Sequence, residues 1–250
     1  MARISLPQVT LCAATSVNVA ATVAAMQHSM TLCDFGAALL LTDQILAPPP
    51  EGIAVQHISN LESSAGYSRF ILSEMVQYIT TSHVLVVQWD GFVLHPEAWD
   101  PAFMEFDYIG AVWPQFTDGA VVGNGGFSLR SKRLLDACCS LGLAEHPEDV
   151  AICRTHRARL EEEFGVRFAS PSIAVHFSYE RTERVGTEFG FHGVFNLPTE
   201  AGSDGFWSIY QMLDNRSALA PNLRELIWPM LRHRQGFRRA LRILMDQLFC

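Results

Sequence analysis

The sequence predicts an α/β protein in which helices flank a mixed, mainly parallel central sheet. Apolar runs of strand length alternate with segments of helical periodicity through the first 90 residues. Strands that alternate with helices indicate crossover connections and parallel pairing. The run at 83–88 is almost continuously apolar, which is typical of a strand buried on both faces. With 250 residues, 49% hydrophobic and 18% charged, the chain can form a sizeable core.

The spacing of apolar residues predicts each element in turn. In the first part of the chain we expect strands at 8–14, 36–43, 52–59 and 83–88, and helices at 16–30 and 64–79. Beyond residue 90 we expect a short helix, a strand within 107–113, and a glycine-rich turn at 121–131 that opens onto a strand or a helix. Further helices are expected at 131–141 and 147–165, and a strand interrupted by a proline at 166–180. Gly165 is the expected C-cap.

Charge divides the chain into two parts. The whole chain carries −8, which argues against a general nucleic-acid binder. Residues 216–250 hold seven arginines and two acidic residues, a net charge of +5 that leaves −13 on the remainder. We therefore predict an α/β domain at 1–200 and a basic amphipathic helical tail at 201–250, with a break near Pro229.

The cysteines and the N-terminus indicate the compartment. Six cysteines occur without any CxxC pair, so neither a zinc ribbon nor a disulfide framework is indicated. The apolar run near the N-terminus is broken by Thr15, Ser16 and Asn18, which favours a strand, turn and helix over a targeting segment. No apolar run reaches the length of a membrane span. We expect a cytoplasmic protein with reduced thiols.

Polar residues follow three of the predicted strands. Thr15 and Asn18 follow the first, Asp43 ends the second, and Gln88 and Asp90 follow the last of the four. Ligands of open α/β sheets bind outside the carboxyl ends of the strands, so these side chains could line one crevice. Asp90 is either a turn residue or a ligand for Mg²⁺ or Mn²⁺ that also holds substrate phosphates.

Two further motifs carry candidate chemistry. The stretch 123–131 contains Gly125 and Gly126, which permit a close approach of backbone to ligand, although a hairpin turn explains them equally. Glu148 and Asp149 begin a predicted helix, where they either cap it or serve as a general base.

Two single residues also have alternative interpretations. His192, between an aromatic residue and a glycine, is a structural hydrogen-bonding group or a metal ligand. Arg69, early in the helix before the 83–88 strand, is a solvated surface cation or a group that reaches a diphosphate.

Taken in order, these motifs resemble a family. The series YSRF, HVLVVQWDGF, DYIGAVW, VGNGGFSLRS, PEDVAICR and FGFHG resembles a glycosyltransferase-like domain family of unknown specificity. More distantly it is similar to sugar-nucleotide-dependent glycosyltransferases with the GT-A fold. The similarity extends over residues 6–197 and implies a GT-A-like sheet, a nucleoside-diphosphate sugar as donor, and Mn²⁺ or Mg²⁺ as cofactor.

The resemblance also implies roles for single residues. Asp90 stands at the acidic motif that binds metal and diphosphate, and His192 at the histidine that completes the metal shell. Gln88 departs from the usual Asp-x-Asp motif, so weak metal binding is expected in the absence of nucleotide. The remaining matches place Gly125 and Gly126 against the donor sugar and acceptor, Asp149 or Glu148 as catalytic base of an inverting enzyme, and Thr15, Asn18 and Asp43 near the nucleotide base or ribose.

Three functions remain open at this stage. The first is an inverting transferase that acts on a surface glycan or lipid-linked saccharide, the second a nucleotidyltransferase, and the third a non-catalytic domain that binds a sugar nucleotide or glycan. The tail has two interpretations as well. Residues 221–250 either dock on the acidic body or form a homodimer contact, or they lie on the inner face of an anionic membrane.

Overall fold

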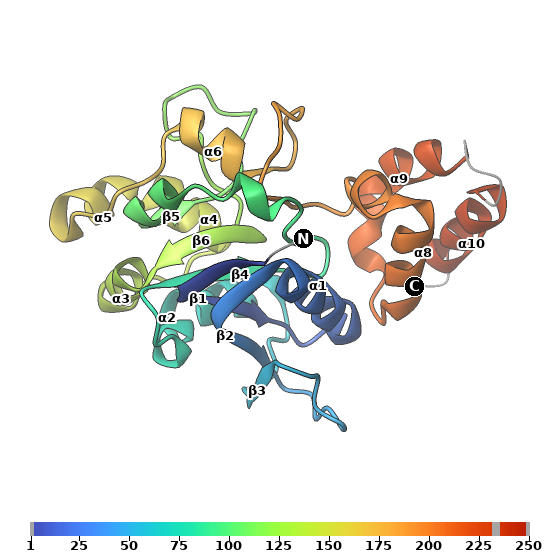
Figure 1. Cartoon of the computed structure of the whole chain (residues 1–250), viewed down its shortest axis with the longest axis horizontal. Coiled ribbons are helices and arrows are strands. Elements are labelled where there is room, and N and C mark those ends of the chain that lie inside the picture. The colour runs from blue at the N-terminus through green and yellow to red at the C-terminus, as the bar shows by residue number, and fades with distance from the viewer. Residues whose placement is uncertain (1–2, 232–235, 249–250) are drawn as a thin grey trace.

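A six-stranded sheet forms the centre of the computed structural model, which describes residues 3–231 and 236–248. The strands lie in the order β3-β2-β1-β4-β6-β5 (Figure 1). β1 (Ile4–Ala14), β2 (Cys33–Thr42), β3 (Ala54–His57) and β4 (His83–Val87) are parallel, and β6 (Phe127–Ser131) runs antiparallel to β4 and to β5 (Tyr108–Ile109). The predicted fold class, a mixed and mainly parallel sheet flanked by helices, is confirmed.

Alternating side chains of the central strands form two separate cores. Cys12, Val84 and Val86 face α2 (Ser64–Ser73), the 3₁₀ turn η1 (Met75–Tyr78) and α3 (Lys132–Leu141). Leu11 and Leu85 face the opposite way, toward α1 (Val19–Leu32), η3 (Pro101–Glu105) and α6 (Pro171–Phe177). Because side chains of a strand alternate between faces, a run that is apolar at every position must be covered on both.

The third quarter of the chain differs from the sequence prediction. The predicted strand at 166–180 is wrong: Pro171 stands at the first turn of α6, where its missing N–H costs nothing, and only β7 (Ser178–Tyr179) follows as a strand, paired with β8 (Gly190–Phe191). The predicted helix at 147–165 is divided into α4 (Glu148–Val150), a π-helical turn η4 (Ala151–Thr155) and α5 (Arg157–Phe164). Gly165 is left-handed at the end of α5, as expected of a C-cap.

The C-terminal part forms a small helical unit beside the sheet domain (Figure 1). It consists of α7 (Leu197–Glu200), α8 (Gly202–Met212), the 3₁₀ helix η5 (Ser217–Asn222), α9 (Leu223–Met230) and α10 (Gly236–Leu248). Phe206, Leu219, Leu226 and Ile243 are buried in a core that this unit shares with α1 and with the segments around Phe92 and Phe191. α9 runs through Pro229 and ends at the next residue. Within the described part of the chain, no helix is long and apolar enough to cross a membrane.

Candidate active site

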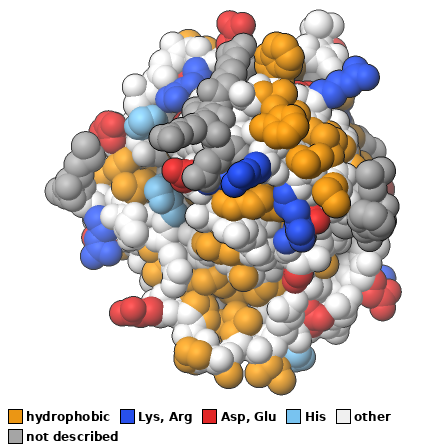
Figure 2. All heavy atoms as spheres, turned by 90° about the vertical axis from the view of Figure 1, so that its right-hand side faces the viewer, with side chains coloured by type: hydrophobic (Ala, Val, Ile, Leu, Met, Phe, Trp, Pro, Cys, Tyr) orange, Lys and Arg blue, Asp and Glu red, His pale blue; other side chains and the backbone are white. Residues whose placement is uncertain are grey.

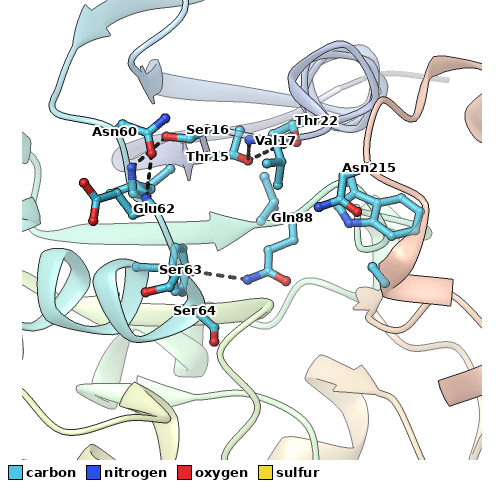
Figure 3. A pocket seen from close by; sticks show the side chains of 16 residues that line it. Thr15, Ser16, Val17, Thr22, Asn60, Glu62, Ser63, Ser64, Gln88 and Asn215 are labelled. Atoms are coloured by element: carbon cyan, nitrogen blue, oxygen red, sulfur yellow. Dashed lines mark hydrogen bonds between the residues drawn. The ribbon is translucent and has the colours of Figure 1, made fainter. Parts of the chain in front are cut away.

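Two cavities adjoin at the carboxyl end of β4 and the first turn of α2. The first, about 450 Å³, is formed by the segments after β1 and before α2 together with Asn215 and Ala218 (Figure 3). The second, about 360 Å³, lies between the glycine-rich segment before β6, the start of α4, and His192. Ser64, Tyr67 and Gln88 line both cavities. The two spaces therefore form adjoining parts of one site.

Asp90 lies at the site because a buried strand ends directly before it. All of β4 is buried, and a turn follows in which the Gly91 N–H donates to the Gln88 carbonyl at 3.1 Å. A Cβ at position 91 would lie 2.8 Å from the Phe191 carbonyl oxygen. The glycine thus allows the β4 turn to pack against β8, and this contact brings Asp90 beside His192.

His192 is the centre of a polar cluster. Its Nε2 lies 3.3 Å from Asp90 Oδ1 and 3.3 Å from Gln88 Oε1, and its Nδ1 lies 3.3 Å from Glu180 Oε1 and 3.2 Å from Asn124 Nδ2. Burial by itself lowers the pKa of His192, but the carboxylates of Asp90 and Glu180 outweigh it and raise the pKa to about 10. The imidazole is therefore protonated at neutral pH when no cation competes for Nε2.

The cluster also fits a divalent cation. Asp90 Oδ1 is buried and, apart from the ion pair with His192 Nε2, has no partner among residues 3–231 and 236–248. Two ligands of one cation stand about 3 Å apart when each is about 2.1 Å from it, close to the separations of Asp90 Oδ1 and Gln88 Oε1 from His192 Nε2. Glu180 at Nδ1 would orient the ring, as carboxylates do for metal-bound histidines.

The protein offers few ligands for such a cation. No set of three or more His, Cys, Asp and Glu side chains is arranged to hold a metal ion in the described part of the chain. Asp90 itself lines neither cavity, whereas Gln88 and His192 do. A cation here would depend on a ligand in the cavity for its remaining oxygens.

The two neighbouring acids at the start of α4 have different surroundings. Glu148 is buried and pairs with the fully buried Arg130, whose Nη2 donates to Oε1 at 3.1 Å. Asp149 accepts from the Gly125 N–H at 3.1 Å and has no arginine partner among the described residues. Burial and the adjacent Glu148 carboxylate raise the pKa of Asp149. Glu148 is thus committed to an internal ion pair, whereas the Asp149 carboxylate accepts from the backbone N–H groups of Gly125 and Val150.

Gly125 and Gly126 allow the backbone to pack closely against two side chains of the site, Glu148 and His192. A Cβ at Gly125 would lie 2.0 Å from Glu148 Oε1, and one at Gly126 would lie 2.0 Å from His192 Nε2. Asn124 precedes them in the left-handed region, with φ of 68°, and its Oδ1 accepts from the Gly126 N–H. The glycines are therefore required for packing against α4 and His192, rather than only for a turn.

The first cavity contains some of the residues expected there. Thr15 lines it, whereas Asp43 does not and accepts from Asn60 Nδ2 at 2.6 Å. Asn18 does not line the cavity. Its Nδ2 donates to the Asn215 carbonyl and its Oδ1 accepts from the Asn215 N–H, so it fixes the C-terminal segment instead. The structure thus gives Asn18 a different contact from the one expected.

Arg69 is not part of the site. Its side chain is exposed and lines neither cavity, whereas the preceding residue, Ser68, lines the second. Conversely, Glu180, Arg130 and Asn215 were not predicted, because each acts through a contact distant in sequence. The local signal was a single arginine, at position 130, in a short strand that is buried at every position.

Comparison with known proteins gives a family and some similar folds. The family described as protein of unknown function (DUF5672) matches residues 53–192, which contain Asp90, Asp149 and His192. Among curated proteins there is no match.

Three solved structures are similar in fold. One is a mannosyltransferase from Pyrobaculum calidifontis in complex with GDP-Man and Mn²⁺ (12% identity, TM-score 0.43, 99% of this chain and 78% of that one). The second is a glycosyltransferase involved in glycosylation of the major capsid of PBCV-1 (10%, 0.46, 81% and 98%). The third is a homologue of Mycobacterium tuberculosis rv0371c from Mycobacterium sp. strain JC1 (11%, 0.39, 82% and 94%). At these values, similarity says nothing about substrate or reaction.

Proposed function

Because the chain belongs to the family of protein of unknown function DUF5672, whose description states no activity, we propose a function from the site itself. The protein is a metal-dependent glycosyltransferase that moves a sugar from a nucleoside-diphosphate sugar to a hydroxyl acceptor with inversion. The acceptor is a surface glycan or lipid-linked saccharide. The observation that carries the proposal is the buried Asp90 Oδ1 paired with His192 Nε2 at 3.3 Å, where two cavities adjoin.

The two adjoining cavities suit a donor that consists of a nucleotide and a sugar. The first cavity is lined by hydroxyl and amide groups such as Thr15, Ser16 and Asn60, which can bond a nucleotide base or ribose. Figure 3 shows Gln88 between these groups and Asn215. The second cavity, with Asp149 and His192, is left for the sugar and the acceptor.

The diphosphate would lie where the cavities meet, beside Gln88 and His192. Asp90, Gln88 and His192 would hold Mn²⁺ or Mg²⁺, which neutralises charge on the leaving diphosphate when bound. When no cation is bound, the protonated imidazole of His192 presents positive charge to the same space.

Asp149 is the proposed catalytic base. It lines the second cavity, and its raised pKa brings the carboxylate closer to the basicity needed to accept a proton from an acceptor hydroxyl. The Gly125 N–H fixes the position of one carboxylate oxygen. Glu148 would set the helix start through Arg130 and take no proton.

Donor hydrolysis and nucleotide binding test the proposal together. A panel of nucleoside-diphosphate sugars with Mn²⁺ should contain one that the wild-type protein binds and slowly hydrolyses, and Asp90→Ala should lose the metal-dependent part of that binding in calorimetry. Binding with neither hydrolysis nor transfer to any acceptor would favour a non-catalytic sugar-nucleotide-binding domain. The presence of Gln88 in place of a second carboxylate supports that candidate. Undiminished binding by Asp90→Ala would remove Asp90 from the site.

A further inference from the structure

The outer surface of the C-terminal helical unit combines exposed apolar side chains with arginines. On α10, Phe237 is 70% exposed, and Leu241, Leu244 and Met245 are between 42% and 49% exposed. Trp228 on α9 is 67% exposed. Figure 2 looks onto this side of the molecule and shows apolar and basic side chains intermixed on it. Exposed apolar groups gathered in this way mark an interaction surface. We propose that this face of α10 docks on an anionic lipid bilayer.

α10 has apolar residues on two sides, and its own domain covers only one. Ala240 and Ile243 are buried, and Ile243 belongs to the core of the helical unit. Phe237, Leu241 and Leu244 repeat at intervals of four and three residues, so they form a stripe along the other side. A helix that served only to cover its own domain would need the first side alone.

The charged side chains of α10 are arranged as binding to an anionic surface requires, with arginines exposed and the acid mostly buried. Arg238 and Arg242 flank the apolar stripe and are exposed. The one described acid of α10, Asp246, is mostly buried, where it accepts from Tyr210 and from Arg216 Nη1 at 3.0 Å. It also pairs with Arg242 Nε at 2.9 Å, although the Arg242 side chain itself stays 64% exposed. Outward cations beside an apolar stripe are the pattern of a helix that lies in the headgroup region of an anionic bilayer.

A bilayer suits this face better than a second copy of the chain. In a two-fold dimer the same patch meets itself, so a patch with exposed arginines would face a patch of the same charge. Phosphate headgroups instead supply the opposite charge. α10 is about 20 Å long, so it would lie in the plane of the surface.

Vesicle flotation tests the proposal. The full chain should float with phosphatidylcholine vesicles that contain phosphatidylserine, much less with pure phosphatidylcholine, and less at high salt. Leu241→Asp combined with Leu244→Asp should reduce binding about tenfold or more. Phe237→Ser and Arg238→Glu, tested singly, should each reduce it by smaller factors. Ile45→Asp, which alters an apolar side chain that is 89% exposed after β2, is the matched control and should bind as wild type.

Three results would overturn the proposal. They are equal binding to neutral and anionic vesicles, an Ile45→Asp variant that loses as much binding as the α10 variants, and full binding by the double aspartate variant with an unchanged thermal unfolding curve. A dimer that the aspartates dissociate in analytical ultracentrifugation, without any vesicle binding, would assign the face to a second copy instead.

Discussion

Gly126 and His192 are packed so closely that no side chain fits at position 126. A Cβ there would lie 2.0 Å from His192 Nε2, the atom that also faces Asp90 and Gln88. The position of the imidazole, and with it the geometry of the candidate cation site, depends on the absence of one methyl group.

The first prediction concerns this contact. Gly126→Ala should displace the His192 ring and weaken Mn²⁺-dependent nucleotide binding about 10- to 100-fold in calorimetry, because misoriented ligands lose affinity on that scale. Gly186→Ala is the control, since a Cβ there meets none of the described residues within 4 Å and its φ is not positive. Equal affinity in the Gly126 variant would show that His192 is not a ligand.

A second prediction concerns the amide at Gln88. Gln88→Glu keeps the shape of the side chain and adds a negative charge beside Asp90, so it should tighten binding of Mn²⁺ alone about tenfold. Gln88→Ala removes the oxygen and should weaken it. Titration monitored by Mn²⁺ electron paramagnetic resonance measures both. If neither variant changes the affinity, the cation does not bind between Gln88 and His192.

The third prediction separates the adjacent acids by activity. Asp149→Asn should reduce sugar transfer about 100-fold or more and leave donor binding intact, because a base is needed only in the chemical step. Single-turnover rates and donor affinity are the two measurements. A variant that keeps its rate would exclude Asp149 as the base.

Glu148 should affect stability instead. Glu148→Gln leaves the buried Arg130 without its carboxylate, and breaking a buried ion pair from one side should lower the free energy of unfolding by about 3 kcal/mol or more. Urea denaturation measures the loss. Glu145→Gln is a suitable control, because Glu145 pairs with His156 at the surface. A loss no larger than that of the control would contradict the structural role.

The last prediction is a pH dependence of folding. Burial tends to raise the pKa of Asp107, but hydrogen bonds from Arg133, Ser131 and the Arg167 N–H outweigh it and hold the pKa below the usual 3.8. A carboxyl whose pKa is lower in the folded state stabilises the fold above its unfolded pKa, and this contribution is lost as the pH falls through the folded value. Urea unfolding between pH 7 and pH 3 should show the decline, and Asp107→Asn should flatten it. An equally steep decline in the variant would assign it to other groups.

Local pattern was sufficient for the four parallel strands of the sheet and for half of the candidate site, whereas it did not distinguish a strand from a helix at β6. The continuous apolar run that forms β4 predicted a doubly covered strand, and a polar residue after such a strand lies at the sheet edge in any parallel α/β fold. The 166–180 segment was mispredicted because Pro171 was interpreted as interrupting a strand, when the same residue begins a helix equally well.

The missing half of the site depends on distant contacts. Glu180 reaches Nδ1 of His192 through the pairing of β7 with β8, two strands of two residues each that carry no periodic signal. Asn215 reaches the first cavity through Asn18, across 197 positions of sequence. Neither contact can be recognised from a short stretch of the sequence.

The two hydrogen bonds between Asn18 and Asn215 determine when the first cavity is completed during synthesis of the chain. Strands β1 to β4, with the residues that line one side of the first cavity, leave the ribosome early, but Asn215 and Ala218 close that cavity from the other side. Asn18 holds a left-handed backbone with φ of 54° and a buried amide whose partner has not yet been synthesised. A nascent chain shorter than about 218 residues can therefore contain the sheet while the first cavity still lacks a wall.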